Sequence, residues 1–208
     1  MESFEGRDEL APIFWYLTYF HEAGHAIAAL QSGRPVNEIY IHPTDGYTCH
    51  GLDKSDYNAE DCRFIVTAGP WAEVRALWAI LGIDKDAHDD AGLSFGHKLR
   101  DFLRKNSDDW RDYHQALGHT VSEDDRRQAR DAYFDVGVPP PYECPPEGGW
   151  DALPEQLWFE ARRLAMAMLG AEDVIEIGYG QLPLDRLPPT RWRRRGWQPS
   201  ELSTAAEN

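Results

Sequence analysis

The chain has 208 residues and carries 36 acidic and 21 basic side chains, which gives a formal net charge of −15 at neutral pH. Its 42% hydrophobic content can fill a core and argues against wholesale disorder, while the negative charge argues against nucleic acid as a partner. Three cysteines without a C-x-x-C pair exclude a disulfide framework and a thiolate zinc site, and they indicate a reducing compartment.

The pattern of apolar residues predicts a mainly helical single domain over residues 1–187 with one small β-hairpin. A helix over 12–31 begins at a proline and ends before Gly33. Alternating apolar residues over 36–42, a Pro-Thr-Asp-Gly turn and a return over 47–52 predict the hairpin.

The rest of the domain is predicted as shorter helices. The pair Gly69-Pro70 is expected to divide one helical stretch into two, because proline is disfavoured inside a helix. The expected helices cover residues 58–68, 71–81, 97–105, 107–118, 122–135 and 153–169.

Local signals also mark the end of this helical region. Ser122 and Asp125 resemble a capping box that opens a helix. Residues 137–150 hold many prolines and glycines, so an irregular loop is expected there. Residues 188–208, with their run of arginines, are predicted to be a flexible, solvated tail.

One stretch, residues 11–30, is apolar over about the length of a membrane span. It contains His21, Glu22 and His25, which are costly in lipid, and no second stretch of similar length is available to pack against it. The N-terminal residues are acidic where a secretory signal is basic. We therefore expect a soluble, cytoplasmic protein without membrane insertion.

His21, Glu22 and His25 form the pattern H-E-x-x-H. Residues four apart on a helix project from one face, so both imidazoles can bind one zinc ion. Glu22 points to one side of that pair, where it can take a proton from a water whose pKa zinc lowers to about 7. The motif predicts zinc-dependent amide hydrolysis with Glu22 as general base. A partly buried helix with two satisfied histidines is the alternative without a metal.

A zinc site of this kind needs a third protein ligand and an open fourth position. The metzincin extension is excluded, because Ala28 and Gln31 stand where it requires Gly and His. A downstream carboxylate is the natural candidate, and the residues alone leave many of these open.

Residues 19–26 resemble the zinc helix of the FtsH-type ATP-dependent metalloproteases, whose peptidase domain carries H-E-A-G-H-A. Residues 39–48 are similar to that domain's strand, proline and G-Y-T segment. Residues 67–73 resemble its A-G-R-x-A-E-E helix, with Pro70 and Val74 departing from the pattern. The resemblance covers about residues 19–117 and implies an FtsH-like zinc metallopeptidase fold. We expect the ATPase module and the membrane anchor of that family to be missing here.

In that family the third zinc ligand is an aspartate that opens a downstream helix in a context like S-x-D-[LI]. The segment 107–110 is the best match, so the resemblance implies Asp109 as the third ligand and Asp108 as the alternative. Both acids also suit the first turn of a helix without any metal, because the helix dipole favours negative charge there. Further candidates for this position are Asp89, Asp90 and His88.

Glu73 lies in line with Leu77 and Ile80 on its predicted helix, so it is turned partly towards the interior. The matching glutamate of the family lies close to the zinc, which implies a hydrogen bond from a ligand histidine to Glu73. A direct ligand is the alternative, but that class of peptidase usually has an acid at the place of Leu77. An ordinary glutamate at a helix start is the third interpretation.

We therefore expect a stand-alone zinc metalloendopeptidase that acts on unfolded or extended proteins or peptides. Its zinc is held by His21, His25 and Asp109. One alternative is a zinc-binding regulatory or interaction module with little proteolysis. Another is a protease of narrow specificity that cuts one regulator. The sequence leaves the oligomeric state and the existence of a separate ATPase partner open.

Overall fold

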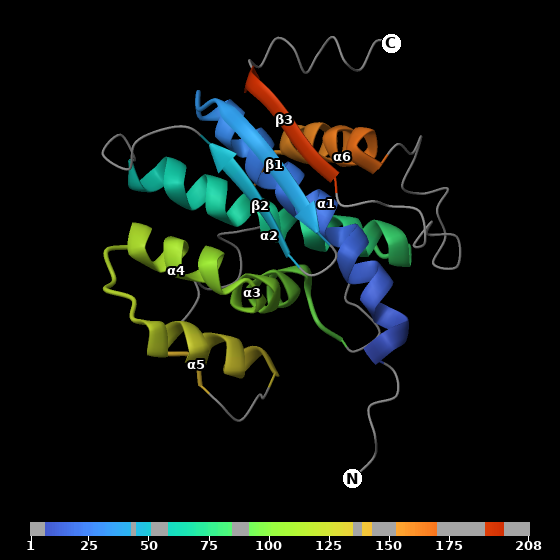
Figure 1. Cartoon of the computed structure of the whole chain (residues 1–208). Helices are drawn as coiled ribbons and strands as arrows, with labels where there is room; N and C mark the ends of the chain where they lie inside the picture. Colours follow the sequence, from blue (N-terminus) through green and yellow to red (C-terminus); the bar gives the residue numbers. More distant parts are fainter. Residues whose placement is uncertain are drawn as a thin grey trace.

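The computed structural model describes residues 7–42, 45–50, 58–84, 92–134, 139–142, 153–169 and 190–197 (Figure 1). This part of the chain is mainly helical with a small antiparallel sheet, which confirms the predicted class and the hairpin. The elements are α1 (Arg7–Gln31), β1 (Val36–His42), β2 (Asp45–His50), α2 (Ala59–Leu81), α3 (Phe95–Lys105), α4 (Ser107–Ala116), α5 (Glu123–Phe134), α6 (Glu155–Leu169) and β3 (Thr190–Trp197).

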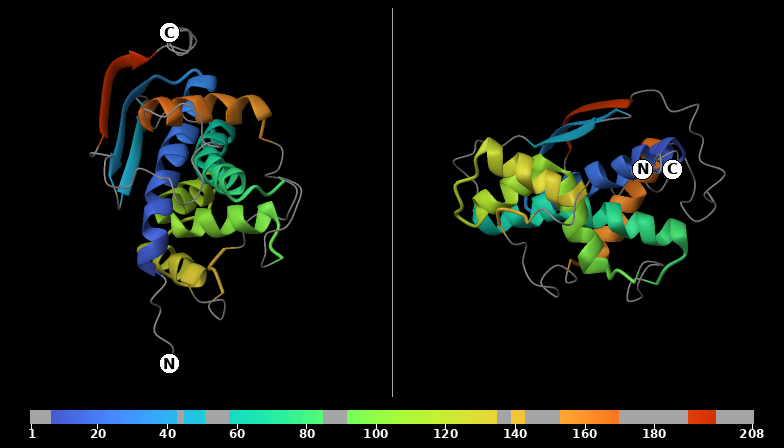
Figure 2. Two further views of the ribbon diagram at one scale, coloured as in Figure 1. Left: turned by 90° about the vertical axis from the view of Figure 1, so that its right-hand side faces the viewer. Right: turned by 90° about the horizontal axis from the view of Figure 1, so that it is seen from below.

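Helix α1 lies at the centre of the fold. The sheet covers one side of α1, α2 lies along the other, and α6 packs against α1 as well (Figure 2). The middle of α1 is accordingly buried over a whole turn and more, which explains its apolar sequence. Among the residues whose burial is described, the largest fully buried side chains are Trp78, Trp110, Arg34, Tyr16, Tyr19, Phe20, Leu17, Ile27, Ile41, Leu99, Leu103 and Leu157.

The crossing of α1 and α2 depends on small residues. A side chain at Gly24 would collide with the carbonyl oxygen of Ala68, and one at Gly69 would collide with the imidazole of His25. Glycine at both positions lets the two helices approach until backbone meets backbone. The H-E-x-x-H turn of α1 is therefore pressed directly onto the middle of α2.

Helix α2 runs without a break through Gly69 and Pro70, so the division into two shorter helices was wrong. A proline inside a helix removes one intrahelical hydrogen bond and pushes on the carbonyl four residues earlier. Here the residues on both sides of Pro70 are buried in the contact with α1, and this packing offsets the local cost. Tertiary burial has overridden the local signal.

Helix α2 is also, among the described residues, the one helix long and apolar enough to cross a membrane by length and composition. Of its apolar window, 67% is buried inside the structure. A buried core helix passes the same test, so this single helix is weak support for a membrane span.

The sheet has the strand order β2-β1-β3, and both pairings of β1 are antiparallel. In β1, Ile39 lies opposite Thr48 of β2 on one side and opposite Trp192 of β3 on the other. For residues 190–197, this third strand differs from the predicted flexible tail over 188–208, and the rest of that tail lies outside the described residues. Strand pairing uses backbone groups that every residue except proline provides, so an arginine-rich segment can pair with the open edge of β1.

The helices that follow α2 begin at polar caps. The side chain of Ser94 accepts a hydrogen bond from the backbone of α3, and Asn106 precedes α4. Ser122 and Asp125 exchange backbone and side-chain hydrogen bonds at the start of α5, which confirms the predicted capping box. Of the loop predicted over 137–150, residues 139–142 are described and form neither helix nor strand, and the others lie outside the described residues.

Candidate metal centre

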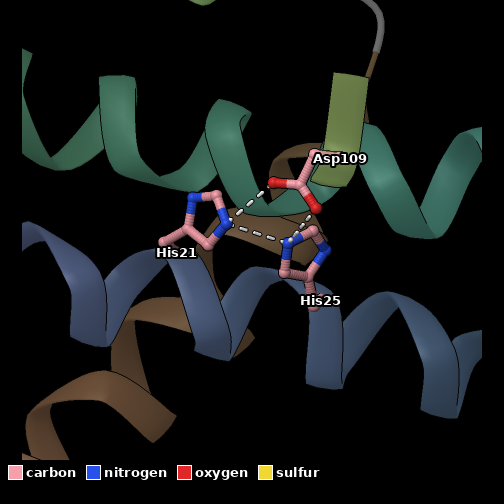
Figure 3. Close-up of side chains that lie close together, drawn as sticks. All are labelled: His21, His25 and Asp109. Atoms are coloured by element: carbon pink, nitrogen blue, oxygen red, sulfur yellow. Dashed lines mark hydrogen bonds and ion pairs between the residues drawn. The ribbon is translucent and has the colours of Figure 1, made fainter. Parts of the chain in front are cut away.

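His21 and His25 project from one face of α1 towards the first turn of α4, where Asp109 lies (Figure 3). The two Nε2 atoms are 3.0 Å apart. Asp109 Oδ2 lies 3.0 Å from Nε2 of His21, and Asp109 Oδ1 lies 3.4 Å from Nε2 of His25. These three residues offer ligand atoms that all lie within 4.8 Å of one another, as a shared metal ion requires.

The second ring nitrogen of each histidine faces an acceptor. Nδ1 of His25 lies 2.8 Å from the carbonyl oxygen of Ile65, and Nδ1 of His21 lies 2.9 Å from Oε2 of Glu73. A carbonyl oxygen and a carboxylate can only accept a hydrogen bond, so both Nδ1 atoms carry a proton. When the rings are neutral, both Nε2 atoms therefore present lone pairs, which can bind a cation.

Two facing lone pairs and a carboxylate repel one another unless a positive charge lies between them. Among the described residues, no donor makes a well-formed hydrogen bond to the buried Oδ2 of Asp109. Two imidazoles and one carboxylate are the donors that a catalytic zinc ion takes from a protein. The residues present therefore fit a zinc ion.

The electrostatics of the metal-free site agree with this geometry. Burial alone lowers the pKa of His21 and His25, but the carboxylate of Asp109 raises both pKa values overall. Burial alone raises the pKa of Asp109, and the two histidines lower it far below its usual range. Asp109 therefore stays ionised and attracts positive charge, either protons on the rings or a divalent ion.

Glu22 lies beside the cluster and is almost fully buried, with 3% of the residue exposed. Its Oε2 accepts a hydrogen bond of 2.8 Å from the hydroxyl of Thr48 in β2. The backbone of β2 comes so close that a side chain on Gly46 would lie 2.7 Å from Oε1 of Glu22. Burial raises the pKa of Glu22, and the nearby histidines oppose that shift only in part. This suits a general base that works near neutral pH.

The structure separates the two adjacent aspartates that the sequence offered. Asp108 points away from the cluster and pairs with Arg126 and Arg111, at 2.6 Å and 2.9 Å, and its side chain is 70% exposed. Asp108 is thus not among the gathered ligand atoms, although Asp109 is. The remaining candidates, His88, Asp89 and Asp90, lie outside the described residues.

Glu73 is buried in α2 behind His21, at the end of the ring that faces away from Asp109. It contacts the histidine and not the cluster centre, so the geometry is that of an acceptor that orients His21 rather than of a direct ligand. Burial alone raises the pKa of Glu73, but Lys105 and His21 lower it overall, so the carboxylate is ionised.

Sequence reasoning missed three partners of the site. The carbonyl of Ile65 has no sequence signal, because every residue of a helix carries the same backbone group. Thr48 belongs to the G-Y-T segment, but the sequence does not show that its hydroxyl meets Glu22. Lys105 lies at the end of α3 with its Nζ 3.0 Å from Oε1 of Glu73. Its closeness to Asp109 in the sequence is the signal that points to it.

Comparison with known proteins adds one finding. A family model described as Peptidase M50B-like matches residues 8–84. That segment contains α1, the hairpin and α2, and so His21, Glu22, His25 and Glu73, but it ends before Asp109. The match supports a metallopeptidase domain, the class of protein that the site also indicates. M50 is the site-2 protease family, so the match does not single out the FtsH type. No curated protein and no solved structure matches the chain.

Proposed function

We propose that this chain is a zinc-dependent metalloendopeptidase in which His21, His25 and Asp109 hold the metal and Glu22 moves the proton. One observation carries the proposal: two Nε2 lone pairs and a carboxylate converge on one point, while acceptors occupy both Nδ1 atoms. The match to a metallopeptidase family over the H-E-x-x-H helix supports the same class of reaction.

A bound zinc ion would supply Lewis acidity for the attacking water and the scissile carbonyl. The protein supplies the proton transfers. Glu22 takes a proton from the attacking water and delivers it to the leaving amine, which departs readily only once it is protonated. The hydroxyl of Thr48 holds Oε2 of Glu22 at 2.8 Å, so the carboxylate stays in one orientation through both transfers.

The substrate would be an unfolded or extended protein or peptide. β2 lies at one side of the described sheet and passes directly beside Glu22 through Gly46 and Thr48. An extended segment that pairs with β2 would run alongside the site. Main-chain pairing accepts many sequences, so cleavage would depend little on side chains.

The finer assignment that we favour is an FtsH-like peptidase. The H-E-A-G-H-A sequence and an aspartate in the first turn of a downstream helix both support it. We further propose a cytoplasmic protein that neither inserts into a membrane nor binds nucleic acid. The net charge of −15 and the burial of α2 support these last two points.

The variant Glu22→Gln tests the proposal. It should bind zinc like the wild type, because Glu22 is not among the ligand atoms, but cleave unfolded casein about 100-fold or more slowly. Cleavage is followed by release of a fluorescent label, and zinc content by elemental analysis. Glu60→Gln, an exposed glutamate at the start of α2, is the matched control and should cleave normally.

Equal cleavage by the wild type and Glu22→Gln removes Glu22 from the mechanism. A wild type that binds zinc but cuts neither casein nor any protein of a cell extract is a zinc-binding module instead. Absence of zinc from metal-replete wild type refutes the metal site itself.

A further inference from the structure

The carboxylate of Glu73 is held by more than His21. Lys105 Nζ lies 3.0 Å from its Oε1, and Asn106 Nδ2 lies 3.4 Å from its Oε2, the oxygen that also faces His21. The side chain of Glu73 is only 3% exposed. A buried carboxylate is costly unless opposite charge and hydrogen bonds compensate for the lost water. These contacts therefore stabilise Glu73 in its buried position.

The two residues that hold Glu73 form the junction between α3 and α4. Lys105 is the last residue of α3, and Asn106 is the cap that precedes α4. Asp109 follows within the first turn of α4. One short junction therefore carries both the contacts to Glu73 and the carboxylate that meets the two histidines. Its contacts with Glu73 of α2 therefore help to set the distance between Asp109 and the H-E-x-x-H helix.

We propose that Lys105 is a positioning residue of the metal centre and that it acts through Glu73. This inference rests on the metal site proposed above. The ammonium occupies Oε1, which leaves Oε2 to accept the Nδ1 proton of His21. That hydrogen bond sets the tautomer and the direction of the ring, and so aims Nε2 at the metal. Lys105 is itself held over the ring of Phe102, at 5.0 Å from its centroid.

A purely structural bridge between α2 and α3 would have a different signature. Loss of such a bridge lowers the stability of the metal-free protein but leaves the affinity of the folded site for metal unchanged. Loss of a positioning residue lowers that affinity and changes the ligand field of the bound ion. Metal affinity and a metal spectrum therefore separate the two roles.

The experiment uses the full chain, stripped of metal and titrated with Co²⁺ and, in competition with a chelator, with Zn²⁺. Lys105→Met should weaken metal binding about 10- to 100-fold and alter the visible absorption of the Co²⁺ form. Lys105→Arg keeps the charge and should restore most of the affinity. Arg104→Met is the control, because Arg104 is the neighbouring cation on α3 but pairs with Asp101 instead of Glu73.

A double-mutant cycle tests the route through Glu73. In the Glu73→Gln background, Lys105→Met should weaken metal binding less than about 3-fold further, because its partner is already gone. Circular dichroism and thermal unfolding of each metal-free variant report on folding. If Lys105→Met does not fold, Lys105→Gln and Lys105→Arg take its place in the same cycle.

The outcomes distinguish this inference from the proposed function. A wild type that binds no metal refutes the metal site, and the inference with it. If the wild type binds metal tightly and the folded Lys105→Met variant binds it equally well, the role of Lys105 is refuted, but the metal site is not. An effect that is as large in the Glu73→Gln background as in the wild type shows that Lys105 does not act through Glu73.

Discussion

The described part of the chain contains two close pairs of histidines, and only one has the surroundings of a metal site. In the first pair, His21 and His25 face each other through Nε2 at 3.0 Å. In the second pair, His114 and His119 face each other through Nδ1 at 3.2 Å, with stacked rings. His114 is fully buried and also lies against the ring of Tyr142.

The charge around each pair makes the difference. The carboxylate of Asp109 raises the pKa of both histidines in the first pair against the effect of burial. In the second pair, burial and then His119 lower the pKa of His114 to about 4, and no carboxylate in the described part of the chain opposes them. One neutral ring can donate to the other there, and no cation is needed. Burial and proximity alone therefore do not identify a metal site.

The largest effect is expected when one histidine of each pair is replaced. His25→Ala should weaken zinc binding about 1000-fold or more, because two protein ligands remain out of three. His114→Phe keeps the aromatic packing and should change the affinity less than about 3-fold. Competition with a coloured chelator measures both. Similar losses from the two substitutions contradict the distinction between the pairs.

A smaller effect on zinc affinity is expected when the adjacent aspartates of α4 are replaced one at a time. Asp109→Asn keeps the shape of the side chain but removes the charge, so zinc should bind about 100-fold more weakly. Asp108→Asn is the matched control. It loses only exposed ion pairs to Arg126 and Arg111, and the affinity should stay within a few-fold. Isothermal titration of both variants gives the answer, and equal affinities speak against Asp109 as a ligand.

The smallest effect concerns the second pair of histidines and the dependence of the free energy of unfolding on pH. The pKa of His114 is about 4 in the folded chain and near 6.5 for an unperturbed histidine, so the unfolded state binds more protons between these values. The contribution of His114 to the free energy of unfolding is therefore complete above pH 6.5 and is lost as pH falls to about 4.

Urea unfolding of metal-free protein at pH 7 and pH 5 measures this contribution. Wild type should lose more stability between the two pH values than His114→Phe, by on the order of 1–2 kcal/mol. His97→Gln, which replaces an exposed histidine, is the control and should behave like the wild type. A pH dependence unaffected by His114→Phe shows that His114 does not carry the effect.

The part of the site that lies on one helix was open to prediction, because periodicity along α1 places His21, Glu22 and His25. The third ligand, Asp109, was predicted only through a resemblance, because its sequence neighbourhood alone does not distinguish it from Asp108. What separates them is the direction of each side chain in the first turn of α4. That direction follows from contacts with α1 and α5.

The fold, too, has features set by residues close in the sequence and features set by residues far along the chain. The capping box at Ser122 and the hairpin depend on neighbours in sequence, and both were predicted. The continuity of α2 through Pro70 and the strand over 190–197 depend on partners far along the chain. Local composition argued against both, and packing and pairing determined them.

The pairing of β1 with β3 has a consequence for biosynthesis. The ribosome completes the histidines, Glu73 and Asp109 long before it makes β3, which comes from the far end of the sequence. The nascent chain can therefore bring the two histidines, Glu73 and Asp109 together while one edge of β1 is still uncovered. Until β3 pairs with it, a stretch of β1 backbone is exposed to any other growing chain nearby.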